Sequence, residues 1–198
     1  MPKTGYSVIF NKKINGFNRS VNIDSDKSIS QRSFIIGSIS EGISKVKNAL
    51  ESEDVFSTIN CLRKLNCKIK KIKKGGYEIY GKGLGSFHCK KNTVLDFGNS
   101  GTGARLIIGC LSINPNIQVK LMGDISLNKR SMFKIIKVME KFGAKFLPKN
   151  KFHFPLTLIS SEIPIGFKFN AGISSQIKSA VILAGTNSYG KTLIVEKI

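Results

Sequence analysis

Three short segments of the chain combine small, hydroxyl-bearing residues with a closing cation. They are Asp26–Arg32, Asn99–Arg105 and Gly172–Lys178, and an apolar run with helical spacing follows each. A helix N-terminus presents unpaired N–H groups and a partial positive charge, and Ser, Thr, Arg and Lys side chains add further donors for anions. One such segment alone is more simply a capped helix with a surface cation. Three in register predict a binding site for a ligand with several negative groups.

The three segments recur with a period of 73 residues, which aligns Arg32, Arg105 and Lys178. Strand-like runs precede and follow each predicted helix. The aligned positions in these runs are Val21, Val94 and Phe167 before the helices, and Val46, Val119 and Thr192 after them. Each unit therefore begins with a strand, a helix and a second strand.

The first two units continue with a second helix and a hairpin. Residues 55–65 and 132–142 place their apolar residues on one helical face, and hairpins are predicted over 68–80 and 145–159. The second hairpin is expected to turn near Asn150 and return over 152–159. Glycines follow the first hairpin at 81–85. Because the spacing of these glycines differs from that of nucleotide-binding loops, we predict that they form the exit of the hairpin.

The repeats predict an α/β (α+β) fold of βαβαββ units about a pseudo-threefold axis. The units run from about 18 to 90, 91 to 163 and 164 to 198, and the third ends after its second strand. We expect a fragment, a truncated gene product or a piece expressed on its own, because an unfinished repeat leaves apolar faces uncovered. A naturally short third unit remains the alternative.

The chain carries 32 Lys and Arg against 12 Asp and Glu, a formal net charge of +20. Such a charge raises the local concentration of anions and is typical of nucleic-acid-binding proteins. Only five of these cations are arginines, however, and the lysines are scattered along the chain. We predict no specific nucleic-acid binding and keep an RNA-binding or RNA-processing module as an alternative.

Four cysteines lack metal-ligand or CxxC spacing, and His88 and His153 add none. No apolar run approaches the roughly 20 residues of a membrane helix, and Met1–Asn15 has no apolar block of signal-peptide type. We therefore expect reduced thiols, no metal site, no membrane association and a cytoplasmic location.

Four motifs together resemble the shikimate-pathway enolpyruvyl transferases, the 5-enolpyruvylshikimate-3-phosphate synthase family. They are Asp26–Arg32, Phe97–Arg105, Gly123–Arg130 and Ser174–Ala180, with an acidic turn at Glu51–Val55. The resemblance implies transfer of the enolpyruvyl group of phosphoenolpyruvate to the 5-hydroxyl of shikimate 3-phosphate, through a tetrahedral intermediate and with release of phosphate. This reaction belongs to chorismate and aromatic amino acid biosynthesis and needs no metal or organic cofactor.

The resemblance also implies an inside-out barrel domain that closes on a second, similar domain, in a protein that is a monomer when complete. Residues 1–17 would pack with that second domain, which is absent from this chain and would supply the remaining acid–base groups. We therefore expect the chain alone to bind shikimate 3-phosphate weakly and to turn over negligibly.

Site residues are implied one by one. Lys27 would be catalytic and touch both substrates. Shikimate 3-phosphate would be held by Lys27, Ser28, Arg32, Ser174, Ser175 and Gln176, with Arg32 on its carboxylate and the two serines on its phosphate. Phosphoenolpyruvate would be held by Lys27, Gly101, Arg130 and Gln176, with Asn99, Thr102, Asp54 and Arg105 nearby. Gly101 and Thr102 resemble the glyphosate-sensitive form of the family.

Some positions depart from the family pattern. Gln31 stands where His or Asn is usual, and Leu106, Ser131 and Ser25 replace two common prolines and a glycine. A related enolpyruvyl transferase acts on UDP-N-acetylglucosamine, but its first motif begins Lys-Asn, whereas here Ser28 follows Lys27. It remains an alternative that a failure to bind a UDP-sugar would eliminate.

Overall fold

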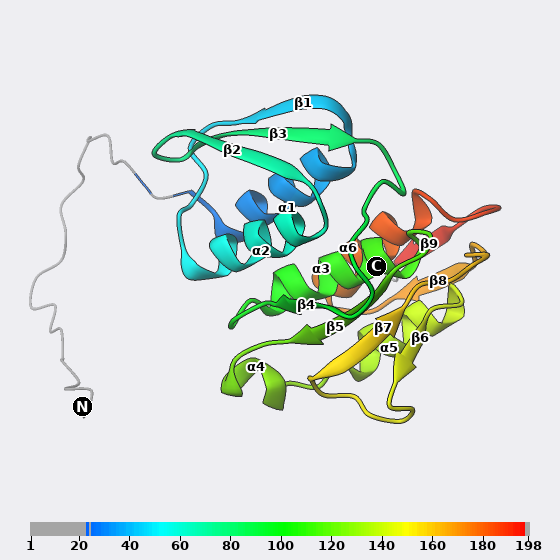
Figure 1. Cartoon of the computed structure of the whole chain (residues 1–198). Helices are drawn as coiled ribbons and strands as arrows, with labels where there is room; N and C mark the ends of the chain where they lie inside the picture. The colour runs from blue at the N-terminus through cyan, green and yellow to red at the C-terminus, as the bar shows by residue number, and fades with distance from the viewer. Residues whose placement is uncertain (1–22, 24, 197–198) are drawn as a thin grey trace, which may run out of the picture.

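The computed structural model describes residue 23 and residues 25–196 of the 198-residue chain (Figure 1). The strand predicted around Val21 and the segment 1–17 lie outside the described residues. Among the described residues, no helix is both long enough and apolar enough to cross a membrane.

The first unit has the predicted order of elements after its first strand. It contains α1 (Lys27–Ile39), β1 (Glu41–Val46), α2 (Glu53–Lys64), β2 (Lys68–Lys73) and β3 (Gly76–Lys82). The three strands form an antiparallel sheet in the order β1-β3-β2. The predicted hairpin is confirmed, with its turn at Gly75 in the left-handed region and its exit at Gly83.

The second unit repeats this order with one addition. It contains β4 (Thr93–Asp96), α3 (Gly101–Ser112), β5 (Gln118–Met122), α4 (Ile125–Lys129), α5 (Phe133–Lys141), β6 (Lys145–Leu147) and β7 (Leu156–Ile159). Its sheet has the order β4-β5-β7-β6, in which β4 and β5 are parallel and the other pairs antiparallel. The pairing β5-β7-β6 matches β1-β3-β2 in the first unit, so the repeat holds in three dimensions.

The return strand of the second hairpin was predicted from residue 152, and this is wrong by four residues. The strand β7 begins only at Leu156, directly after Pro155. Proline has no N–H to give to a sheet ladder, so pairing starts after it. The helix α5 likewise begins at Phe133, because Met132 serves as its N-cap.

The third unit contains β8 (Lys168–Ala171), α6 (Ser175–Gly185) and β9 (Leu193–Glu196). The two strands pair in parallel, as β4 and β5 do. The unit therefore shows the strand–helix–strand start that the repeat predicts.

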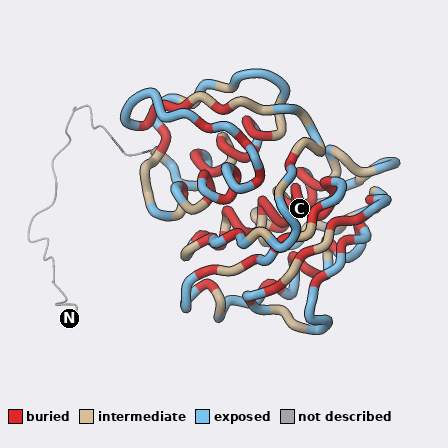
Figure 2. Tube along the Cα trace, viewed as in Figure 1, coloured by how far each residue is buried: buried red, intermediate tan, exposed pale blue. Residues whose placement is uncertain are grey.

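The described strands form three separate sheets, so no closed barrel is present among them. The helices α1, α3 and α6 lie inside, and the first sheet covers the outer side of α1 and α2 (Figure 1). Their facing residues make the core, including Phe34, Leu106, Ile108 and Val181, which are fully buried (Figure 2). The outward placement of the sheets agrees with an inside-out arrangement.

The three inner helices are equivalent but differ in length. Their C-caps are Ser40, Ile113 and Thr186, which keep the predicted 73-residue spacing. Their N-caps are Asp26, Ser100 and Ser174, which are 74 residues apart, so the helices contain 13, 12 and 11 residues. The three cations keep the 73-residue spacing of the C-caps, but each lies closer to its own N-cap than the cation of the preceding unit does.

Candidate anion-binding site

The N-terminal ends of α1, α3 and α6 meet at one end of the molecule. Gln31 of α1 donates to the hydroxyl of Ser100, the N-cap of α3. Gln176 of α6 donates to Thr102 Oγ1 of α3 at 2.9 Å, and Arg32 of α1 donates to Ser179 Oγ of α6 at 3.1 Å. Each pair of helices is thus joined within its first two turns, as convergence of the three N-termini requires.

Each helix is capped by the side chain that precedes it. Asp26 accepts a hydrogen bond from the Ile29 N–H at 2.7 Å, Ser100 from Gly103 at 3.2 Å and Ser174 from Ile177 at 3.4 Å. A cap satisfies one of the free N–H groups of a helix start and leaves others for a ligand, although in α3 the Gly101 N–H already donates to the Asn99 carbonyl oxygen at 2.9 Å. Ser175, the first residue of α6, is exposed beside them.

Lys27 lies at the start of α1 and forms an ion pair with Asp54 at the start of α2. The Lys27 Nζ is 2.6 Å from Asp54 Oδ2, and 47% of the lysine side chain is exposed. Being this exposed, the pair gains little from its charge attraction, so an anionic ligand can compete for the lysine.

Arg32 lies one turn further along α1. Its guanidinium donates to the Ser28 carbonyl oxygen at 3.2 Å as well as to Ser179. Within the part of the chain that the structure describes, no carboxylate lies within 4.0 Å of it. Its charge is thus left for a ligand, and the contacts with Ser28 and Ser179 hold it between α1 and α6.

A second cluster joins α3 and α6 around Gln176. Arg105 Nη1 donates to the Gly101 carbonyl oxygen at 3.0 Å and to Gln176 Oε1 at 2.9 Å. The Gln176 amide nitrogen contacts Thr102, so both ends of this amide are fixed by α3. Burial, and then the neighbouring Arg130 charge, lower the pKa of Arg105. Two adjacent cations without an acid between them are a favourable place for an anion.

Arg130 reaches the same place from the end of α4. A methyl group built on Gly101 would lie 2.9 Å from Arg105 Nη1 and 3.3 Å from Arg130 Nη1, so both guanidinium groups lie against this glycine. Arg130 donates to Asn99 Oδ1, and the Asn99 amide nitrogen donates to Asp124 Oδ2 at 2.8 Å. The loop before α3 therefore holds Arg130 in place.

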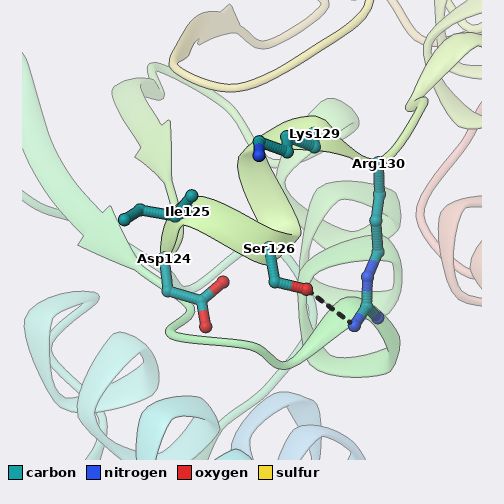
Figure 3. Close-up of a pocket in the computed structure, with 5 residues that line it drawn as sticks. All are labelled: Asp124, Ile125, Ser126, Lys129 and Arg130. Carbon is teal, nitrogen blue, oxygen red and sulfur yellow. Dashed lines mark hydrogen bonds between the residues drawn. The ribbon is translucent and has the colours of Figure 1, made fainter.

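Asp124 caps α4 and accepts from the Leu127 N–H at 2.7 Å. That bond mainly, followed by those from Asn99 and the Ser126 N–H and by the charge of Arg130, lowers the pKa of the Asp124 carboxyl. Beside it lies an open pocket of about 680 Å³, in which Arg130 points toward Ser126 (Figure 3). Its lining residues are Asp124, Ile125, Ser126, Lys129 and Arg130.

Apart from Ser174 and Ser175 at the start of α6, the predicted site residues thus fall into three neighbouring groups. Lys27 is paired with Asp54; Arg32 lies with Ser28 between α1 and α6; and Gly101, Thr102, Arg105 and Gln176 gather on α3 and α6, with Asn99 and Arg130 beside them. Lys178, the third cation of the repeat, pairs instead with Glu196 of β9.

Sequence reasoning missed several polar residues that organise the site. Ser100 and Asp124 could have been found, because Ser and Asp immediately before a helix are strong N-cap signals. The contacts of Gln31 with Thr58 and Ser100 could not, since they join residues 27 and 69 positions apart. No group of three or more His, Cys, Asp or Glu side chains in the described part of the chain is placed to hold a metal.

Comparisons with known proteins agree with one another. The family profile of EPSP synthase (3-phosphoshikimate 1-carboxyvinyltransferase) matches residues 11–198. A 3-phosphoshikimate 1-carboxyvinyltransferase of Ruegeria sp. (strain TM1040) is 37% identical over 176 residues, and one of Novosphingobium aromaticivorans is 38% identical over 180 residues. These alignments cover 88% and 90% of this chain.

A solved structure of EPSP synthase from Acinetobacter baumannii superimposes with a TM-score of 0.81 and 32% identity, over 89% of this chain. The chain spans about 40% of the length of these relatives: 39% and 40% of the two sequences and 40% of the solved structure.

Proposed function

Since the chain belongs to the EPSP synthase family, we propose that it supplies part of an active site for enolpyruvyl transfer. The reaction moves the enolpyruvyl group of phosphoenolpyruvate to the 5-hydroxyl of shikimate 3-phosphate and releases phosphate. The observation that carries this proposal is the meeting of three helix N-termini with Arg32, Arg105 and Arg130, none of which has a carboxylate within 4.0 Å among the described residues.

Shikimate 3-phosphate is held by α1 and α6. Arg32 binds its carboxylate, for which the planar guanidinium is suited, and Ser174 and Ser175 bind its phosphate at the start of α6. Lys27, Ser28 and Gln176 complete the contacts. The bond from Arg32 to Ser179 supports this assignment, because it places the guanidinium against the helix that begins with the two serines.

Phosphoenolpyruvate is held by Gly101, Arg130, Gln176 and Lys27. Gly101 allows close approach to the α3 backbone, because it has no side chain. Arg105 is a neighbour that orients Gln176, and Asn99 does the same for Arg130. Thr102 and Asp54 also lie beside these ligand-binding groups, through Gln176 and Lys27 respectively.

Within this site, Lys27 is the catalytic residue of the chain. The 5-hydroxyl adds to the enolpyruvyl carbon while a proton adds to the methylene carbon, and the tetrahedral intermediate then loses a proton and phosphate. Lys27 and the arginines stabilise the negative charge that moves onto the leaving phosphate. The acid–base groups for the two proton transfers come from a second domain outside this chain, and these must lie within hydrogen-bond reach.

The wider assignments follow from the same proposal. The complete protein acts in the cytoplasm as a monomer, in aromatic amino acid biosynthesis, and the unit limits near residues 90 and 163 divide its first domain. The chain alone binds shikimate 3-phosphate weakly and turns over negligibly. Steady-state formation of product by the purified 198-residue chain would contradict this last point.

A thermal-shift titration with shikimate 3-phosphate tests the site. A ligand at a hundred times its Kd stabilises a folded protein by about 2.7 kcal/mol, and we expect a saturable rise in Tm that shikimate does not reproduce. Arg32→Lys keeps the charge but loses the planar fork, so it should weaken the response. Lys91→Ala removes a cation from an exposed turn and should leave it unchanged. No response of the unaltered chain to the phosphate ester would contradict the proposal.

A further inference from the structure

Gln31 is a fully buried glutamine that the proposed chemistry does not use. It lies on α1, one turn after Lys27 and next to Arg32. Its amide nitrogen is 2.9 Å from Thr58 Oγ1 and 3.1 Å from the Asp54 carbonyl oxygen, and it also donates to Ser100 Oγ. A single side chain thus connects α1 with the first turns of α2 and with the N-cap of α3.

The two hydrogens of the Gln31 amide nitrogen are shared among these three acceptors, and Gln31 Oε1 is buried without a hydrogen-bond partner among the described residues. A carbonyl oxygen can only accept, and the Thr58 hydroxyl donates to that same Asp54 carbonyl at 2.9 Å, so Thr58 accepts from Gln31. Ser100 also accepts from the Gly103 N–H as the cap of α3. The cluster therefore requires a donor at position 31, and a carboxylate or an apolar side chain cannot replace it.

The cluster also has no spare room. A methyl group built on Gly103 would lie 2.4 Å from Thr58 Oγ1, 2.7 Å from Ser100 Oγ and 3.2 Å from the Gln31 amide nitrogen. Contacts this short are closer than side chains tolerate, so the three elements are packed against one another at fixed spacing. A change in the length or bonding of Gln31 must move one of them.

Two of the three partners of Gln31 lead directly to residues of the candidate site. Asp54, whose carbonyl oxygen Gln31 holds, pairs through its carboxylate with Lys27. Ser100, whose hydroxyl Gln31 holds, immediately precedes Gly101. We propose that Gln31 is a positioning residue that sets the spacing between the Lys27 ammonium group and the N-terminus of α3, an inference that rests on the proposed function of this site.

Gln31→Met tests this inference, because methionine has about the same length and fills the space without donating a hydrogen bond. The matched control is Asn114→Leu, which removes a buried amide at the opposite end of α3, where Asn114 bonds to Phe87 and Pro115. The Kd for shikimate 3-phosphate and for phosphoenolpyruvate is measured by titration calorimetry, at a temperature where every variant is folded. Partners that orient ligand-binding groups typically matter by about tenfold or more, and we expect this loss for Gln31→Met with at least one ligand.

Asn114→Leu should lower Tm and leave both Kd values unchanged, which separates positioning from general stability. Ser100→Ala provides a second test. If Gln31 acts through Ser100, the variant with both substitutions should have about the same Kd as whichever single variant binds more weakly. If Gln31→Met does not fold, Gln31→Asn, which keeps the amide but is one carbon shorter, is compared in its place.

The outcomes are distinct. Binding by the unaltered chain with equal Kd values for the Gln31 variants would overturn the inference and leave the proposed function standing. Additive effects of the Gln31 and Ser100 substitutions would also overturn it. Absence of binding by the unaltered chain would contradict the proposed function and, with it, the inference.

Discussion

Gly101 is the residue against which two of the guanidinium groups of the candidate site lie. Arg105 and Arg130 approach it from different elements, and each is held by a neutral partner, Gln176 or Asn99. Neutral partners orient the two arginines without cancelling their charge. This part of the site is thus a pair of cations arranged around a backbone position that has no side chain.

Gly101→Ala should weaken binding of phosphoenolpyruvate by about tenfold. The new methyl group would lie 2.9 Å from Arg105 Nη1, and overpacking of this kind typically costs about 1–3 kcal/mol, of which 1.4 kcal/mol is tenfold in Kd. The measurement is a calorimetric titration with phosphoenolpyruvate in the presence of shikimate 3-phosphate.

Gly172→Ala is the matched control for this substitution. A methyl group there meets nothing within 4 Å, so Kd should stay the same. An unchanged Kd in Gly101→Ala would mean that Arg105 can move aside without loss of binding, and that its present position is unimportant.

At the residue scale, the candidate site residues came from short motifs in the sequence, and their roles stay predictions. Gln31 appeared only as a departure from a pattern, because its role depends on Thr58 and Ser100, which packing brings to it from two other helices. The sequence aligned Lys178 with two arginines. In the structure Lys178, on the shorter helix α6, forms an ion pair with Glu196 of β9. Hydrogen bonds between elements depend on relative helix position, which periodicity does not encode.

At the scale of elements, Glu51 joins the loop before α2 to the first hairpin. It accepts hydrogen bonds from the Gly75 N–H at 2.9 Å and from the Tyr77 hydroxyl at 2.8 Å, and it pairs with Lys71. The Gly75 bond first, then those of Lys71 and Tyr77, lower the pKa of Glu51 from 4.5 to about 2. The start of α2, which carries Asp54, is thereby held to the β2–β3 turn.

Glu51→Gln should destabilise the protein in a pH-dependent way. A carboxyl whose pKa is lowered by folding stabilises the native state above its ordinary value of 4.5, and this contribution is lost as pH falls toward 2. The difference in urea midpoint between the unaltered protein and Glu51→Gln should therefore be largest above pH 5 and shrink with acid.

Glu53→Gln, at an exposed position two residues away, controls for the loss of charge near the start of α2. A difference between the unaltered protein and Glu51→Gln that is constant from pH 7 to pH 3 would show that the carboxylate form of Glu51 does not matter.

The contact between α3 and α6 makes a second prediction at this scale. A methyl group on Gly109 of α3 would lie 2.6 Å from the Ala180 carbonyl oxygen and 2.9 Å from its Cα, both backbone atoms that cannot rotate away. Gly109→Ala should therefore force the helices apart and destabilise the protein by about 1–3 kcal/mol, or prevent folding.

Gly37→Ala on α1 is the comparison for this substitution, because its nearest contact is the movable tip of Ile79 at 2.9 Å. It should have the smaller effect on the denaturation midpoint. Equal effects of the two substitutions would contradict the close backbone approach of α3 and α6.

The order of elements was largely predictable, because apolar periodicity and glycine turns repeat twice. The short helix α4 was missed, since five residues are too few to show a period and its start depends on the Asp124 cap. The start of β7 was predicted too early. The alternating apolar residues before Pro155 are typical of a strand, but the proline has no N–H for the sheet ladder. The starts of the three inner helices are 74 residues apart, whereas their C-caps are 73 residues apart. A single repeat period cannot describe both spacings.

At the scale of the whole molecule, the lysines and arginines that give the charge of +20 are scattered along the chain and interrupted by acids. On the outer face of the first sheet, Glu78 lies between Lys45 and Lys70 in the strand register. A continuous basic stripe with exposed aromatics, as in nucleic-acid-binding sheets, is therefore not formed there.

Short RNA should bind to this protein only weakly and without sequence preference. Phosphate neutralisation by scattered lysines gives an affinity that falls steeply as salt increases from 50 to 200 mM. Fluorescence anisotropy with two unrelated labelled RNAs measures this, and shikimate 3-phosphate should not change the result. Tight binding of one RNA that persists at the higher salt would favour the RNA-binding alternative.

The unequal lengths of the three inner helices have a consequence for what this end of the molecule can recognise. Three identical helix starts around an axis would present the same groups three times, which suits a ligand with threefold symmetry. A substituted ring with one carboxylate, one phosphate and one reacting hydroxyl has no such symmetry. The helices keep their C-caps at a constant interval while their starts differ by one residue in each repeat. The repeated units thus share a common frame at the C-caps and present three different helix starts at the other end, as the ligand of the proposed function requires.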